Sequence, residues 1–151
     1  MSDVPHAQAL AVLAGPKFCD TQLSWSERVN HSGHLLATAA LEDDTGAILP
    51  GLTLQLEVKR PIVADRCLYE LGLFLLQNGV RRRVYQLNVC PPDKRSHNGA
   101  AGTLHGAHEH VGDHTAAVTD PTVRCGALGV AFAVFCRRVN LSFSGALNQP
   151  L

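Results

Sequence analysis

The sequence predicts an α+β fold, in which an antiparallel sheet of about five strands carries an N-terminal helix, a long histidine-rich loop and a C-terminal helix packed on the sheet. Three observations support this prediction. Alternating polar and apolar residues fill the region 17–89, helix start signals lie near both ends, and five of the eight histidines gather between residues 97 and 114. The 151 residues match the common size of one domain, so we expect residues 1–151 to form a single domain.

The composition is that of a folded protein without a strong overall charge. Hydrophobic residues make up 46% of the chain and charged residues 17%, unlike the profile of a disordered chain. Thirteen basic residues balance thirteen acidic ones, so contact with nucleic acid requires a local basic patch. The N-terminus lacks the features of a secretory signal, and the apolar stretch 125–136 is too short to span a bilayer. We therefore expect a cytoplasmic protein without membrane contact.

The cysteines are expected to be reduced. Five are present, an odd number without CxxC spacing, at Cys19, Cys67, Cys90, Cys125 and Cys136. Buried free thiols in a cytoplasm are the common state of such residues, so the sequence predicts no disulfide.

The N-terminal half contains a short helix followed by strands. Pro5 and the pair Gly15–Pro16 bracket an Ala- and Leu-rich stretch, which predicts a helix over residues 6–14. Residues 52–59 alternate strictly between apolar and polar types, as in a strand with one face in the core and the other in water. Residues 34–41 lead into the turn-forming segment 43–46, so we expect a hairpin there.

A second hairpin is predicted around Asn78–Gly79, a dipeptide that favours the type I′ turn of two-residue hairpins. A two-residue turn there pairs Gln77 with Val80, Phe74 with Arg83, and Gly72 with Tyr85. Arg81 and Arg83 then share one face and Arg82 takes the other. These three arginines are either solvated charges that protect a sheet edge, which is the interpretation we favour, or cations that face a bound phosphate.

Beyond this hairpin, residues 91–120 show no periodicity and predict a long loop with one embedded strand, and such long loops are commonly functional. Asp120 and Pro121 then offer a helix cap and a first-turn proline for a C-terminal helix over residues 123–139. Apolar residues recur there at helical spacing, and Arg137 and Arg138 suit the negative end of the helix dipole.

The histidine segment supports three functional hypotheses, of which the first is a ribonuclease-like enzyme. In an extended segment His108 and His110 project from one face, and two adjacent imidazoles can serve as general base and general acid toward an RNA 2′-hydroxyl. Asp113 would orient them, and a nearby cation would stabilise the anionic phosphorane. The catalytic candidates are His108, His110, Asp113 and His97, and the phosphate-binding candidates are Lys94 and Arg95.

The second hypothesis is a metal-binding module without catalysis. Its candidate ligands, for a divalent transition metal such as zinc, nickel or iron, are His105, His108, His110 and His114. Glu109 or Asp113 could orient an imidazole. The spacing HxxHEHxxxH lacks the helical HExxH pattern of known zinc enzymes. The third hypothesis is a non-catalytic interaction or inhibitor protein that binds a protein or nucleoprotein partner through the sheet face or the loop. The histidine segment is then a surface loop whose imidazoles only hydrogen-bond the domain or the partner.

A strand hairpin, a histidine–glycine segment with the pattern HxHxGD, and a capped helix follow one another over residues 68–140. The matching residues are His97, His108, His110, Gly112 and Asp113, followed by the helix start Asp120–Pro121–Thr122. This order resembles small bacterial domains of unknown function, including the TumE-type toxins of toxin–antitoxin pairs. The resemblance implies a role in RNA metabolism or defence, with RNA as a partner and a cognate antitoxin as a neutralising protein.

Overall fold

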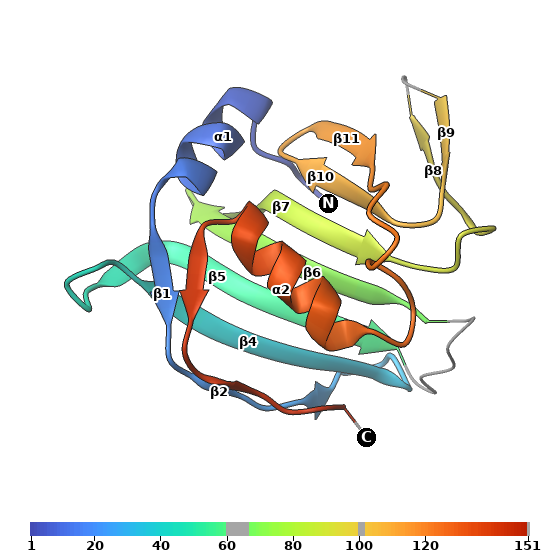
Figure 1. Ribbon diagram of the computed structural model, residues 1–151. Coiled ribbons are helices and arrows are strands. Elements are labelled where there is room, and N and C mark those ends of the chain that lie inside the picture. The colour runs from blue at the N-terminus through green and yellow to red at the C-terminus, as the bar shows by residue number, and fades with distance from the viewer. Residues whose placement is uncertain (60–66, 100–101, 151) are drawn as a thin grey trace.

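The computed structural model describes residues 1–59, 67–99 and 102–150, and it has an α+β fold. Helices α1 (His6–Ala14) and α2 (Leu128–Arg138) pack with a large mixed sheet (Figure 1). Within the described residues, that sheet has nine strands: β11-β10-β7-β6-β5-β4-β1-β12 in spatial order, with β3 paired to β4. The strands are β1 (Lys17–Cys19), β3 (Ser26–Glu27), β4 (His34–Glu42), β5 (Ile48–Lys59), β6 (Tyr69–Gln77), β7 (Val80–Val89), β10 (His108–Val111), β11 (His114–Ala117) and β12 (Leu141–Phe143).

Two smaller sheets flank the main one. They pair β2 (Gln22–Leu23) with β13 (Ala146–Leu147), and β8 (Arg95–Gly99) with β9 (Gly102–His105). The expectation of about five purely antiparallel strands is therefore wrong. The chain returns along α2 before it forms β12, so β12 pairs with β1 in parallel. No local sequence pattern predicts this pairing.

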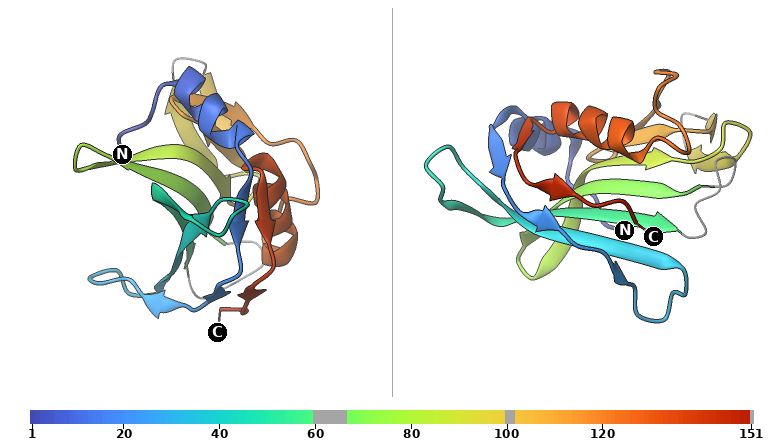
Figure 2. Two further views of the ribbon diagram at one scale, coloured as in Figure 1. Left: turned by 90° about the vertical axis from the view of Figure 1, so that its left-hand side faces the viewer. Right: turned by 60° about the horizontal axis from the view of Figure 1, so that its bottom comes forward.

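The core lies between α2 and one face of the sheet. The apolar positions of the alternating strand β5, including Leu54 and Leu56, are fully buried there, as the alternation predicts. Phe135 of α2 contacts the ring of Tyr85 on β7 with centroids 5.8 Å apart. Figure 2 shows α2 lying along the twisted sheet, and no helix of the described residues covers the opposite face of the central strands.

Both predicted hairpins are present, and the second one contains a bulge. Asn78 and Gly79 have φ values of 52° and 75°, as a type I′ turn requires, and Gln77 pairs with Val80. The register shifts beyond Phe74, so Gly72 pairs with Gln86 rather than with Tyr85. A bulge adds one residue to a strand and thereby reverses which side chains reach each face.

The region 91–120 is not the long loop that the sequence predicts. It contains the hairpins β8–β9 and β10–β11, and β10 pairs along β7 at the edge of the hairpin of β6 and β7. Strands this short owe their pairing to a neighbour rather than to their own periodicity, which explains why the sequence pattern does not show them.

The C-terminal helix also starts later than predicted. Asp120 accepts hydrogen bonds from the backbone N–H and the hydroxyl of Thr122, which forms a turn, and α2 begins at Leu128. Between them, Cys125 forms a disulfide with Cys67, next to the start of β6. The expectation that all five cysteines are reduced is therefore wrong for this pair, while Cys19, Cys90 and Cys136 are not disulfide-bonded.

Helix α1 has the predicted bounds, and a buried lysine joins it to α2. The Nζ atom of Lys17 donates to the carbonyl oxygens of Gly15, at 2.6 Å, and Val139, at 2.9 Å, which lie just beyond the two helices. Burial lowers the pKa of Lys17 to about 8. Within the described chain, no helix is long and apolar enough to cross a membrane.

Candidate functional site

A row of polar side chains crosses the sheet on the face turned away from α2. His108, Asn88, Glu70 and Glu57 are successive cross-strand partners on β10, β7, β6 and β5. Their neighbours along each strand, such as Leu87 and Leu71, point into the core, so these four point the other way. Glu109 confirms the orientation of β10, because its carboxylate accepts a hydrogen bond from Tyr85 on the α2 side.

One end of this row opens into a cavity of about 200 Å³, which we call the His108 pocket. Its lining residues are Leu68, Glu70, Asn88, Cys90, Lys94, Arg95 and His108. The structure thus brings together one predicted catalytic residue, His108, and both predicted phosphate-binding residues, Lys94 and Arg95. Two exposed cations therefore share a cavity with a buried imidazole and a half-buried carboxyl group.

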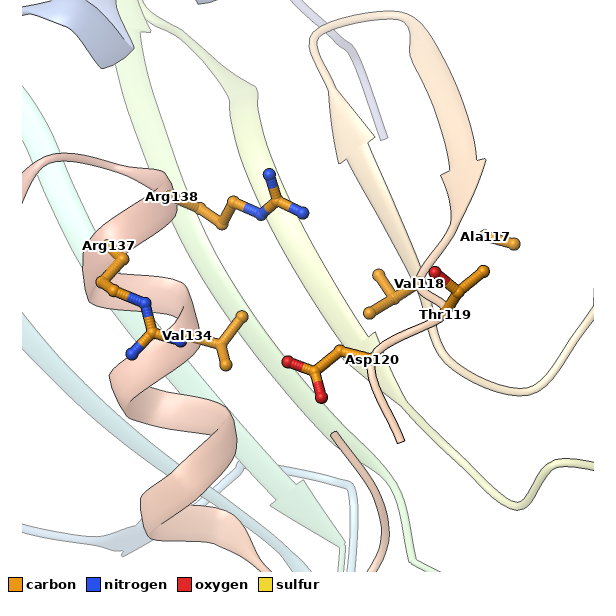
Figure 3. A pocket seen from close by; sticks show the side chains of 7 residues that line it. All are labelled: Ala117, Val118, Thr119, Asp120, Val134, Arg137 and Arg138. Atoms are coloured by element: carbon orange, nitrogen blue, oxygen red, sulfur yellow. The ribbon is translucent and has the colours of Figure 1, made fainter. Parts of the chain in front are cut away.

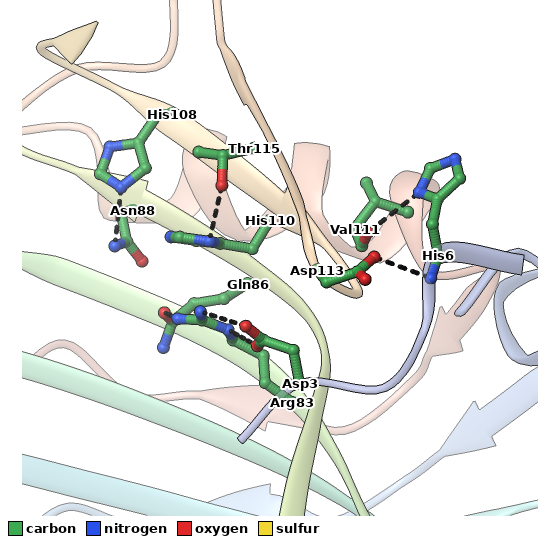
Figure 4. A network of polar contacts seen from close by, with 10 residues as sticks. All are labelled: Asp3, His6, Arg83, Gln86, Asn88, His108, His110, Val111, Asp113 and Thr115. Atoms are coloured by element: carbon green, nitrogen blue, oxygen red, sulfur yellow. Dashed lines mark hydrogen bonds and ion pairs between the residues drawn. The ribbon is translucent and has the colours of Figure 1, made fainter. Parts of the chain in front are cut away.

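His108 is held in a defined orientation and is only 3% exposed. Its Nδ1 atom lies 3.3 Å from the carbonyl oxygen of Gly106, and its Nε2 atom lies 3.1 Å from the Nδ2 atom of Asn88 (Figure 4). A carbonyl oxygen only accepts, so Nδ1 carries the proton and Nε2 accepts from Asn88. The Oδ1 atom of Asn88 is buried without a hydrogen-bond partner among the described residues.

Glu70 is a functional candidate that the sequence analysis missed. Burial raises the pKa of its carboxyl group, and the negative charge of Glu57 on the neighbouring strand raises it further. Glu57 itself pairs with Arg28, at 2.9 Å, and lies 3.4 Å from the Nδ1 atom of His34. A carboxyl group with a raised pKa in the same cavity as an imidazole is a common arrangement for general acid and base catalysis.

The missing signal was the strand register. The register that the sequence predicts would pair Glu70 with Leu87, a core residue, whereas the bulge in β7 places Asn88 opposite Glu70. Alternation along β6 does mark Glu70 as a residue of the polar face. Its proximity to His108 requires knowledge of how three strands align.

His110 lies beside His108, with ring centroids 5.1 Å apart, and is 6% exposed. Its surroundings differ, because Thr115 lies 3.3 Å from its Nδ1 atom and its cross-strand partner is Gln86. Gln86 accepts a hydrogen bond from Arg83, whose guanidinium also pairs with Asp3 at 2.7 Å (Figure 4). His110 thus adjoins a network that fastens the N-terminal segment to β7, and it does not line the His108 pocket.

Asp113 lies away from both imidazoles. Its carboxylate accepts a hydrogen bond from the backbone N–H of His6, at 3.0 Å, the first residue of α1. The ring of His6 stacks on that of His114, with centroids 3.8 Å apart. Pro5, which precedes the helix, offers no side-chain cap, so Asp113 supplies one from a distant part of the chain.

The four predicted metal ligands are not brought together as a set. His108 and His110 lie side by side on β10, whereas His105 ends β9 in an exposed position and His114 is 65% exposed at the start of β11. Among the described residues, no three His, Cys, Asp or Glu side chains form a group that could hold a metal ion. His97 lies in β8, and its side chain is outside the part of the chain that the structure describes.

Comparison with known proteins gives no relative from which a role could be transferred. No protein-family model, no curated protein sequence and no solved structure matches this chain.

Proposed function

We propose that this protein is a phosphodiester-cleaving enzyme that acts on RNA, with the His108 pocket as its active site. The observation that carries the proposal is that Glu70 and His108 share one cavity with Lys94 and Arg95. A base, an acid and two cations are the groups required to cleave an RNA strand by attack of its own 2′-hydroxyl.

The orientation of His108 assigns it the role of general base. Its Nε2 atom carries no proton, so it can take the proton of the 2′-hydroxyl while the 2′-oxygen attacks the adjacent phosphorus. Once protonated, Nε2 becomes a hydrogen-bond donor and needs an acceptor. The Oδ1 atom of Asn88 can accept this hydrogen bond when the amide rotates, since that oxygen has no hydrogen-bond partner among the described residues.

Glu70 is the general acid. Its raised pKa keeps the carboxyl group protonated closer to neutral pH than an ordinary glutamate. It can therefore give its proton to the 5′-oxygen as the phosphorus–oxygen bond breaks, leaving a 2′,3′-cyclic phosphate and a free 5′-hydroxyl. Glu70 and His108 are separated by one strand, which places their Cα atoms about 10 Å apart, and both line the cavity of about 200 Å³ that would hold the phosphate.

Lys94 and Arg95 stabilise the charge that develops on the phosphoryl oxygens. Both are exposed at the rim of the pocket, where they can reach a bound phosphate. The resemblance of the segment around His108 and His110 to TumE-type toxins supports the same substrate class. It also supports a cognate antitoxin as the protein partner, which would act by covering this pocket.

The proposal is tested with purified protein and an end-labelled RNA oligonucleotide, together with a copy that lacks 2′-hydroxyls. We expect cleavage of the RNA alone, with a 2′,3′-cyclic phosphate as the product. His108→Ala and Glu70→Gln should each lower the rate by about 10²- to 10⁴-fold, the usual contribution of one general acid or base.

His114→Ala is the matched control, because this exposed histidine lies outside the pocket. It should cleave at the wild-type rate, and thermal melting should show that every variant is folded. Cleavage that persists in folded His108→Ala protein would rule the proposal out. A rate that falls equally in His114→Ala would instead favour a shared role for the histidine cluster, as in the metal hypothesis.

A further inference from the structure

The His108 pocket adjoins two larger cavities. It shares Cys90 with a cavity of about 350 Å³ that lies under His105 and Arg124. This second cavity shares Val118, Thr119 and Asp120 with a third, of about 470 Å³. The third lies between the segment after β11 and the last turn of α2, where Arg137 and Arg138 line it (Figure 3). We call the three together the basic tract.

Positive charge predominates along this tract. Its lining residues include five lysines and arginines, which are Lys94, Arg95, Arg124, Arg137 and Arg138, against two carboxylates, Glu70 and Asp120. All five cations are exposed. The chain as a whole has a formal net charge of zero, so the excess is local, as a binding patch for a polyanion requires.

One of the two carboxylates and one of the arginines are partly engaged elsewhere. Asp120 accepts two hydrogen bonds from Thr122, which lower its pKa and hold the carboxylate in its turn. Arg138 lies 3.5 Å from Glu109, which compensates part of its charge. Arg124 and Arg137 have no ion pair among the described residues, and they are the cations best placed to meet a ligand.

We propose that an RNA strand bound at the His108 pocket continues through the basic tract to Arg137, with successive phosphates against Arg124 and Arg137. This inference rests on the proposed function and extends it, because it assigns a substrate of several nucleotides rather than a single phosphodiester. The tract passes around the ends of β7 and β10, a path that a flexible single strand can follow and a stiff duplex cannot.

The lining also defines the kind of recognition. Among the described residues that line the three cavities there is no Phe, Tyr or Trp, so a base can stack only on an imidazole such as that of the exposed His105. Most of the affinity must then come from phosphate contacts, which carry no sequence information and depend strongly on salt. The tract therefore predicts strand binding with little base preference.

The experiment measures binding separately from cleavage, with a 2′-O-methyl RNA decanucleotide and a dinucleotide of the same chemistry, neither of which offers a 2′-hydroxyl. Each Kd is measured over a series of salt concentrations. For a single strand, each phosphate contact contributes about 0.7 to the slope of log K against log salt. Arg124→Gln and Arg137→Gln should each reduce the slope for the decanucleotide by about 0.7, and the double variant by about 1.4.

The dinucleotide fills only the His108 pocket, so its binding should not respond to either substitution. Arg81→Gln is the charge-matched control, since Arg81 lies about 23 Å along β7 from Asn88, over the ring of Phe74. It should leave the slope for the decanucleotide unchanged.

If the salt slope for the decanucleotide is the same in Arg137→Gln protein as in the Arg81→Gln control, the inference is overturned. The proposed cleavage by His108 would not be affected by that result. Conversely, the predicted slopes without any RNA cleavage would uphold the tract and reject the proposed function. A polyglutamate chain that binds as tightly, with the same dependence on Arg137, would overturn the assignment to RNA.

Discussion

The Nδ2 atom of Asn88 lies 3.1 Å from the Nε2 atom of His108, while the Oδ1 atom of the same amide has no hydrogen-bond partner among the described residues. This contact joins β7 to β10 and leaves the imidazole with its proton on Nδ1. An amide can donate in one orientation and accept in the other, so Asn88 suits both protonation states of the ring.

Asn88 is accordingly a positioning residue, and its loss should alter the tautomer of His108. In Asn88→Ala protein we expect the Nδ1–H form to lose population relative to the wild type, because the substitution removes the amide that donates to Nε2. Imidazole ¹⁵N chemical shifts measure the tautomers, and Asn148→Ala, a change at an exposed position, is the control. Unchanged shifts in Asn88→Ala protein would show that the amide does not set the tautomer.

Glu70 should make stability depend on pH above the range of an ordinary carboxylate. Its pKa is raised in the folded protein, so the folded state holds the proton more tightly than the unfolded state. The free energy of unfolding should therefore fall as the pH rises from 4.5, the ordinary pKa of a glutamate, through the raised pKa.

Urea unfolding over a pH series measures this effect. Glu70→Gln should remove the fall, whereas Asp44→Asn, at an exposed turn, should keep it. If the unfolding free energies of wild-type and Glu70→Gln protein depend on pH in the same way, the carboxyl group of Glu70 does not have a raised pKa in the folded protein.

The Cys67–Cys125 disulfide should be detectable as two unreactive cysteines. In denaturant without a reductant, iodoacetamide should label three of the five cysteines, which mass spectrometry can count. The double variant Cys67→Ala/Cys125→Ala should have a free energy of unfolding about 2–4 kcal/mol lower than the wild type, because the disulfide joins cysteines that are 58 residues apart in the sequence. Cys136→Ala is the control, and labelling of all five cysteines would refute the bond.

Asp113 should matter for stability and not for cleavage. Asp113→Ala removes the acceptor at the start of α1 and should cost about 1 kcal/mol of unfolding free energy, the usual value of a helix cap. Asp113→Asn keeps an acceptor oxygen and should retain most of that stability. A large loss of RNA cleavage in folded Asp113→Ala protein would restore the hypothesis that Asp113 orients the histidines.

Local features of this protein were predictable because neighbouring residues determine them. Helix α1 has the bounds that its flanking Pro5 and Gly15 indicate, and Asn78–Gly79 adopts the positive φ values of its turn. The core face of β5 follows from its alternation. Part of the site was predictable in the same way, since His108 lies close in sequence to Lys94 and Arg95.

Other features depend on contacts between residues far apart in the chain. The bulge in β7 places Asn88 opposite Glu70. The backbone N–H of His6 donates a hydrogen bond to the carboxylate of Asp113, which lies 107 residues away in the sequence. Cys67 likewise meets Cys125 only once β6 and the segment before α2 have packed together.

The sequence alone thus determined the turns, the amphipathic strands and the place where histidines gather, because backbone preferences and side-chain alternation act over a few residues. Only the tertiary structure decided which of those histidines shares a cavity with a carboxyl group of raised pKa. That arrangement requires the alignment of β6, β7 and β10, and one inserted residue in β7 is enough to change it.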